Sequence, residues 1–185
     1  MNSIHVVDNV FPDWLLKTIQ HGISNLKEWE YGRVQSAFNE EYENYYNCVL
    51  WHKNYPEAKD PLKGLTNTIA SCFALEVLPK VVKSATQGLQ IARLNGTTPA
   101  STQYPHRDCD MGENIDNMYS VVWYPFDSDG GLRFWEDQIV LDKPSQVVEY
   151  KINRAVVFPS HIPHAGLAPT DWPMRVSINT VWALN

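Results

Sequence analysis

The sequence predicts an α+β fold that is mainly β, with N-terminal helices packed outside a C-terminal antiparallel sandwich or barrel. Before about residue 85, apolar residues recur at helical spacing. From about residue 88, short runs rich in Val, Ile and aromatic residues are separated by Gly, Pro, Asn and Asp clusters. The 185 residues, 44% of them hydrophobic, suffice for one packed core. We therefore expect a single domain without a linker, helical over about 1–85 and β over about 88–183.

Two helices are expected in the N-terminal part. Pro12 precedes a stretch with apolar residues at 15, 16, 19, 23 and 26, which places them on one helix face. A second helix is expected from Pro61 to about Leu75, with Pro79 just beyond it as a stop signal. Residues 4–7 fit a short strand, whereas the acidic and aromatic segment 40–46 shows no clear period. The first third is therefore predicted to be mostly helical.

The second half contains short strand-like runs bounded by turn residues such as NGTTP, DSDGG and DKPS. This repetition is typical of an antiparallel sandwich or barrel. The runs are LQIARLN, MYSVVWYPF, GLRFWE, SQVVEY, RAVVFP and RVSINTVWAL.

Charge and composition disfavour several classes of protein. The net charge is −6 and Lys and Arg form no cluster, so nucleic acid is not expected as a partner. The sequence contains no run of about 18 apolar residues, so no membrane span is expected. The N-terminus lacks the pattern of a secretory signal. Three cysteines cannot all pair, which favours reduced thiols and a cytoplasmic location.

The tripeptide His106-Arg107-Asp108 carries the first candidate metal ligands. In an extended backbone, residues i and i+2 point to the same side, so an imidazole and a carboxylate can meet at one point. A third ligand must come from elsewhere, and His161 and His164 in PSHIPH are both candidates. Two histidines and one carboxylate on one face of a metal are typical of non-haem iron(II) oxygenases, because the opposite positions stay open.

Arg175 and Ser177 share one face of the strand-like run at residues 175–184 by the same alternation. A guanidinium recognises a carboxylate in a bidentate manner, and a neighbouring hydroxyl can add a hydrogen bond. Residues 176, 178 and 181 are apolar, so one face of this strand is expected to be packed and the Arg face to meet either solvent or a polar cavity. The pair is suited to gripping the far carboxylate of 2-oxoglutarate beside an iron site.

Taken together, the strings HRD, GGLRFWE, NRAVVFPSHIPHAGLAP and RVSIN resemble the double-stranded β-helix (jelly-roll, cupin-like) of the 2-oxoglutarate/iron(II) oxygenases. The chain is most similar to the prolyl-4-hydroxylase-like group and to small phage and bacterial oxygenases of that type. The resemblance covers about residues 88–183. It implies Fe(II), 2-oxoglutarate and O2 as metal and cosubstrates, with ascorbate in a supporting role.

Carried over to this sequence, the resemblance implies that His106, Asp108 and His164 bind iron. His164 is preferred to His161 because the family's distal histidine follows an FPS-x-x-P stretch. The resemblance also implies that Arg175 and Ser177 bind the cosubstrate carboxylate, helped by the hydroxyl of Tyr124.

Further candidates lie beside these positions. Asn95 is expected to bind the cosubstrate, and with Arg93 it shares one face of the strand before His106 and lines the cleft. Gly130 and Gly131 are expected to form a turn where a side chain would collide.

The activity implied is hydroxylation of an unactivated C–H bond, coupled to the release of succinate and CO2. The resemblance favours a prolyl residue in a protein or peptide, or free proline, and Tyr104, Trp123, Trp135 and Trp172 could contact the pyrrolidine ring or form core. One alternative is a cupin-like module that binds a metal or small ligand without oxidation. Another is a nucleic-acid dealkylating oxygenase, a branch with a second arginine where this chain has Val181.

Overall fold

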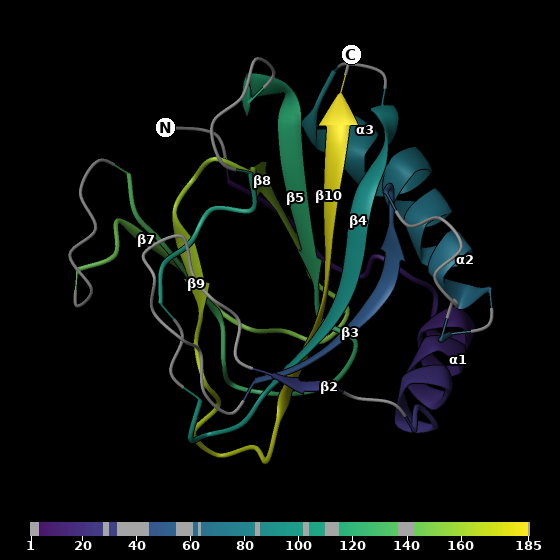
Figure 1. Cartoon of the computed structure of the whole chain (residues 1–185), viewed down its shortest axis with the longest axis vertical. Helices are drawn as coiled ribbons and strands as arrows, with labels where there is room; N and C mark the ends of the chain where they lie inside the picture. The colour runs from purple at the N-terminus through teal and green to yellow at the C-terminus, as the bar shows by residue number, and fades with distance from the viewer. Residues whose placement is uncertain are drawn as a thin grey trace.

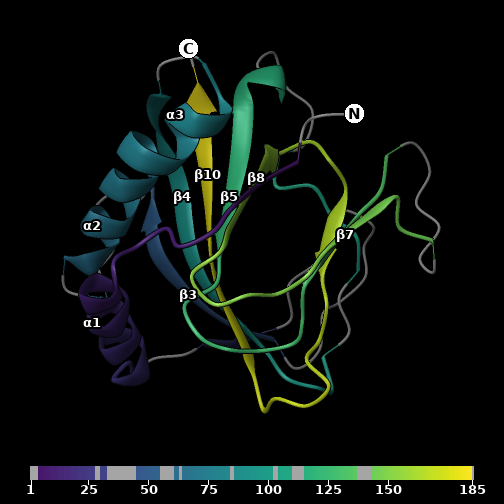
Figure 2. The ribbon, with the colours of Figure 1, turned by 180° about the vertical axis from the view of Figure 1, so that it is seen from behind.

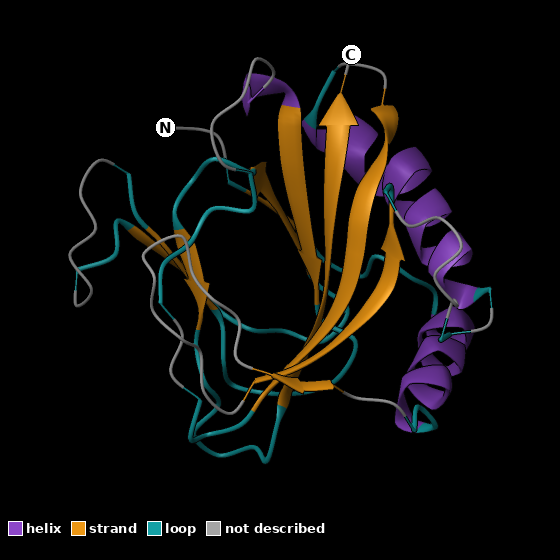
Figure 3. Ribbon diagram, in the orientation of Figure 1, coloured by secondary structure: helices purple, strands orange, loops and turns teal. Residues whose placement is uncertain are grey.

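A seven-stranded sheet and a three-stranded sheet face one another, and the helices cover the outer side of the larger one (Figures 1 and 3). This computed structural model describes residues 4–27, 30–32, 45–54, 61–62, 64–83, 86–101, 104–109, 115–136 and 143–184. No helix in these ranges combines the length and the apolar character that a membrane crossing requires.

All neighbouring strands of the large sheet are antiparallel, as the short runs predicted. The long strand β10 lies between β5 and β4 and pairs with both along most of its length. In spatial order the strands are β1 (His5–Val7), β8 (Ala155–Pro159), β5 (Met118–Trp123), β10 (Arg175–Leu184), β4 (Thr86–Thr97), β3 (Tyr45–His52) and β2 (Glu30–Gly32).

The small sheet has the order β7 (Gln146–Val148), β6 (Leu132–Phe134), β9 (His164–Gly166). The segment around His106 joins its open edge, because His106 forms an antiparallel bridge with His164 at the start of β9. Two antiparallel sheets arranged in this way form the double-stranded β-helix predicted from the sequence.

Strands β5 and β8 of the large sheet alternate between two cores. In β5, Val121 and Trp123 belong to an outer core shared with the helices, whereas Val122 belongs to an inner core between the two sheets. Tyr124, just past the strand, also belongs to the inner core. The same alternation divides β5 and the regular stretch of the β4–β10 ladder into residues on the helix side and residues on the site side of the sheet.

The first helix, α1 (Asp13–Ser24), begins after Pro12 and buries Leu15, Leu16, Ile19 and Ile23, which confirms the predicted face. Seen from behind, it lies with α2 (Leu65–Cys72) and α3 (Leu78–Val81) along one outer side of the large sheet (Figure 2).

The predicted end of the second helix is wrong. The helix begins at Leu65 and continues past Pro79 through the π-helical turn η1 (Phe73–Val77) into α3. Proline lacks an N–H and clashes within a regular α-helix, and a wider turn just before it relieves both problems. Pro79 therefore lies in the first turn of the last helical segment.

The prediction of a mostly helical first third is also wrong, because this part supplies β1, β2 and β3 to the large sheet. In β3, Cys48 and Leu50 are buried whereas Val49 is exposed, which is the alternation of a strand with one covered face. Of the aperiodic segment 40–46, residues 40–44 lie outside the described residues and Tyr45–Tyr46 open β3.

Candidate active site

His106 and His164 form a hydrogen-bonded pair of the antiparallel ladder. The N–H of His106 donates to the carbonyl of His164 over 2.9 Å, and the N–H of His164 donates back to His106 over 2.9 Å. Directly opposite residues place their side chains on the same face. The two imidazoles accordingly lie side by side, with ring centroids 4.5 Å apart.

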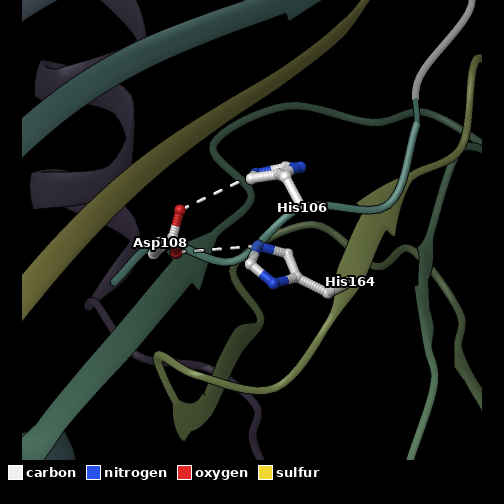
Figure 4. Close-up of side chains that lie close together, drawn as sticks. All are labelled: His106, Asp108 and His164. Atoms are coloured by element: carbon white, nitrogen blue, oxygen red, sulfur yellow. Dashed lines mark ion pairs between the residues drawn. The ribbon is translucent and has the colours of Figure 1, made fainter. Parts of the chain in front are cut away.

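Asp108 completes the group from the next bend of the chain (Figure 4). Its Oδ1 lies 3.7 Å from Nε2 of His106 and its Oδ2 lies 3.6 Å from Nε2 of His164. The potential ligand atoms of the three side chains all lie within 4.8 Å of one another. An extended backbone was predicted at Asp108, but the chain bends there. The N–H of Asp108 donates to the carbonyl of Ser160 over 3.0 Å.

The hydrogen bonds of the other ring nitrogens identify the tautomer of both histidines. Nδ1 of His106 lies 3.3 Å from the carbonyl oxygen of Tyr104, and Nδ1 of His164 lies 3.0 Å from that of Ile162. A carbonyl oxygen only accepts, so each Nδ1 carries the proton. In the neutral form of each ring, Nε2 then carries the lone pair and faces the carboxylate, at distances of 3.6 and 3.7 Å that exceed a hydrogen bond. Three electron-pair donors around one point fit a cation.

Burial reinforces this protonation state. Desolvation lowers the pKa of His164 to about 4, so its imidazole is neutral at pH 7, the form that binds metal. Burial alone would raise the pKa of Asp108, but electrostatic interactions with His164 and His106 and hydrogen bonds from Ser120 and Asn179 hold it below its ordinary value. The carboxylate is therefore ionised although its side chain is only 8% exposed.

Ser120 and Asn179 orient the Asp108 carboxylate, and sequence reasoning missed both. The Ser120 hydroxyl donates to Oδ2 over 2.6 Å, and it also lies 2.8 Å from the Ser160 hydroxyl. The Asn179 amide lies 3.2 Å from each carboxylate oxygen and donates to them. Asn179 continues the alternation that placed Arg175 and Ser177 on one face, so the run RVSIN contained a signal for it.

Arg175 is a buried guanidinium without a counter-charge in the described part of the chain. It is 3% exposed, donates from Nε to the carbonyl of Gly130 over 2.7 Å, and lies 3.3 Å from the Ser177 hydroxyl through a terminal nitrogen. No ion pair joins it to a described carboxylate. A buried charge is costly unless it is paired, so this position is suited to an anionic ligand.

Tyr124 lies next to this guanidinium, whose central carbon is 5.3 Å from the centre of the Tyr124 ring. Burial raises the pKa of Tyr124 although the charge of Arg175 opposes the shift, so the phenol is protonated at pH 7. Its buried hydroxyl has no hydrogen-bond partner among the residues described. In the part of the chain that the structure describes, a phenol without a hydrogen-bond partner thus lies beside a guanidinium without a counter-charge, which fits one end of a dicarboxylate such as 2-oxoglutarate.

Gly130 and Gly131 act as expected through close approach, but the neighbours are protein atoms. A Cβ at Gly130 would collide with the carbonyl of Leu167 and approach the Arg175 side chain, and one at Gly131 would collide with the carbonyl of Val148. The glycine at 130 therefore lets the backbone come close enough to hold Arg175 in place.

Asn95 lies directly opposite Ser177 in the ladder between β4 and β10, and Thr97 lies opposite Arg175. The side-chain oxygens of Asn95 and Thr97 are both buried and unpartnered within the described structure. Thr97 was not among the predicted residues, although it follows Asn95 at the spacing of two that places it on the same face.

Several other candidates lie elsewhere. His161 is not part of the His–Asp–His group. Trp123 packs against Phe11 in the outer core, with ring centroids 4.8 Å apart, so it is core and not a cleft residue. Trp172, 43% exposed, lines a groove of about 650 Å³ on the helix side of the sheet together with Ile23 of α1. Trp172 therefore lies on the other side of the sheet from the His–Asp–His group, away from the position expected for the pyrrolidine ring.

The profile of the 2OG-Fe(II) oxygenase superfamily matches residues 89–183, which contain every residue of the site. The chain belongs to this superfamily and is similar to its prolyl-4-hydroxylase-like members. Its metal and cosubstrates are accordingly Fe(II), 2-oxoglutarate and O2. No curated protein sequence matches the chain significantly.

Solved structures of this class share the fold at low sequence identity. A prolyl hydroxylase from Trichoplax adhaerens, in complex with a hypoxia inducible factor peptide, has a TM-score of 0.62 and 15% identity over 100% of this chain and 84% of its own. A 2OG-Fe(II) oxygenase family oxidoreductase from Burkholderia pseudomallei reaches 0.72 at 12% identity over 98% and 84%. SnoN, an α-ketoglutarate-dependent epimerase from nogalamycin biosynthesis, reaches 0.66 at 12% over 98% and 78%.

Proposed function

We propose that this protein is a hydroxylase in which His106, Asp108 and His164 hold Fe(II), and that it acts on a proline ring, either in a peptide or as the free amino acid. The observation that supports oxygenase chemistry most strongly is the buried, unpaired Arg175 within the same barrel as the His–Asp–His group. Bound iron supplies the redox chemistry that couples decarboxylation of 2-oxoglutarate to C–H hydroxylation.

The protein's own contribution to this chemistry is positioning. Hydrogen bonds from Ser120 and Asn179 fix the plane of the Asp108 carboxylate, and the Nδ1 hydrogen bonds fix both imidazoles. Such outer partners raise metal affinity because the ligands need little reordering on binding.

Arg175 and Tyr124 are proposed to bind the distal carboxylate of 2-oxoglutarate, with Ser177 and Asn95 along its length. Ser177 and Asn95 face each other one step along the ladder from Arg175, toward Asn179 and hence toward Asp108. A cosubstrate held at Arg175 is thereby directed along this row to the metal. A module that only binds metal has no need for these groups, which argues against the cupin-like alternative.

The proline assignment is supported by the likeness of the fold to prolyl hydroxylases. The epimerase SnoN shares this fold, so the substrate needs a direct test. The direct test is succinate release with proline-containing peptides, free amino acids and short oligonucleotides. We expect stimulation by proline compounds, loss of this activity in Asp108→Ala, and a weak visible absorption band when Fe(II) and 2-oxoglutarate are combined without oxygen. Clean metal binding without that band would instead favour the cupin-like module.

The two neighbouring histidines provide a matched comparison. We expect His164→Ala to lose Fe(II) binding and succinate formation by at least about 100-fold, because it removes a neutral imidazole that faces Asp108. His161→Ala should retain metal affinity within about threefold, since His161 lies outside the group. Metal titration of both variants decides which histidine is the third ligand. A greater loss of metal affinity in His161→Ala than in His164→Ala would assign that role to His161.

A further inference from the structure

Arg93 occupies a position in the barrel that the proposed iron and cosubstrate sites do not use. It lies directly opposite Asn179 in the β4–β10 ladder, and residues paired in this way share a face. Asn179 donates to Asp108, so this face is the inner one. Leu94 and Ala92, its chain neighbours, are buried in the outer core. The backbone of Arg93 thus lies on the inner face of the large sheet, opposite the residue that donates to Asp108.

Exposure changes steadily along this row of β4. Thr97, opposite Arg175, is 0% exposed, Asn95 is half-buried and Arg93 is exposed. The row therefore runs from the closed end of the barrel, where the cosubstrate carboxylate is expected, to an end where Arg93 meets solvent in the described structure. A substrate enters from solvent, so it meets Arg93 before it reaches the cosubstrate groups.

The strand partners of Arg93 in the described structure carry no opposite charge. Its partners in the two adjoining strands are Val49 on β3 and Asn179 on β10, and neither is acidic. Within the ranges described, no carboxylate forms an ion pair with Arg93. The chain carries a net charge of −6, which repels anions in general. Within the described residues, Arg93 is a cation without an ion-pair partner at the open end, and it gives an anionic substrate a local point of attraction.

We propose that Arg93 binds a carboxylate of the substrate, and that the protein therefore hydroxylates an acid. This inference rests on the proposed function of the site and narrows its substrate class. It favours free proline, or a peptide whose terminal or side-chain carboxylate lies close to the hydroxylated ring, over an internal prolyl residue without nearby charge.

The test compares substrates that differ only in this charge. L-proline is paired with L-prolinamide, and glycyl-proline with its amide, so the small acid and the peptide acid are examined separately. The full chain is assayed with Fe(II) and 2-oxoglutarate as wild type, Arg93→Gln and Arg133→Gln. Arg133 is the matched control, because it lies on β6 between Leu132 and Phe134, which point into the inner core, and so faces the other way.

In the wild type we expect kcat/KM for the acid to exceed that for the amide by at least about tenfold. Arg93→Gln should remove this preference mainly through KM for the acid, leaving the amide, kcat and KM for 2-oxoglutarate within about twofold. Arg133→Gln should keep the preference. Equal use of acid and amide by the wild type would overturn the inference, and so would a rise in KM for 2-oxoglutarate in Arg93→Gln.

The two proposals fail in different ways. Hydroxylation of the proline amides at the same rate as the acids, unaffected by Arg93→Gln, would refute the carboxylate role and leave prolyl hydroxylation standing. Succinate release with an acid that lacks proline, weakened in Arg93→Gln, would support the carboxylate role and refute the proline assignment.

Discussion

Asp108→Ala is expected to lose Fe(II) affinity by more than about 100-fold and to form no substrate-dependent succinate. The change removes the only carboxylate of the group. The two remaining imidazoles carry no negative charge that could balance a divalent cation. Loss of an outer partner alone costs about 10- to 100-fold, so loss of a ligand exceeds that range. Titration with Mn(II) measures the affinity directly, with the free ion quantified by its electron paramagnetic resonance signal.

Two companion variants separate a local effect from misfolding. Asp116→Ala removes an exposed acid in the short turn before β5 and should leave metal binding unchanged. Ser120→Ala keeps Asp108 but removes its hydrogen bond of 2.6 Å, so an intermediate loss of about 10-fold is expected. If folded Asp108→Ala bound Mn(II) as well as Asp116→Ala does, the assignment of Asp108 as a ligand would be wrong.

Arg175→Met should raise the KM for 2-oxoglutarate while leaving metal affinity unchanged. Removing one partner of a buried, hydrogen-bonded charge pair costs about 2 to 5 kcal/mol, which corresponds to roughly 30-fold to several thousand-fold in affinity. Methionine retains much of the packing volume without the charge. Initial rates of succinate formation over a range of 2-oxoglutarate concentrations give the KM, and Mn(II) titration gives the metal affinity.

Arg175→Lys guards against the possibility that the methionine variant fails to fold, since Arg175 also holds the carbonyl of Gly130. Lysine keeps the charge but not the two-pronged geometry, so an intermediate KM is expected. A KM for 2-oxoglutarate that stays within twofold of wild type in both folded variants contradicts the carboxylate role of Arg175.

The strands of the second half could be predicted because each is a short apolar run between turn residues. β9 could not: its three residues follow Pro163 directly, and its pairing with His106 depends on contacts distant in sequence. β3 was missed because its aromatic start continues an acidic segment without periodicity. The end of the second helix was predicted wrongly because proline usually stops a helix. In the folded protein, the π-helical turn before Pro79 accommodates the proline and the helix continues.

The candidate site was predicted where spacing along one strand determines which residues share a face. Arg175 and Ser177 are the example, and Asn179 and Thr97 follow the same rule without having been identified. Ser120 could not be identified in this way, because its contact with Asp108 depends on how the bend after His106 crosses to β5. Trp123 and Trp172 show the opposite case, since the residue type suggested a substrate contact. Sheet alternation places Trp123 in the outer core, and the loop before β10 places Trp172 in the groove beside α1.

The His106–His164 pair has a mechanical consequence. Both histidines are attached to the small sheet through their shared backbone hydrogen bonds, whereas Asp108 is held by Ser120 and Asn179 of the large sheet. A metal bound by all three therefore cross-links the two walls of the barrel. Because such a cross-link exists only in the folded chain, metal binding adds directly to the free energy of unfolding and resists separation of the sheets. A metal held by the candidate site would thus also hold the two sheets of the barrel together.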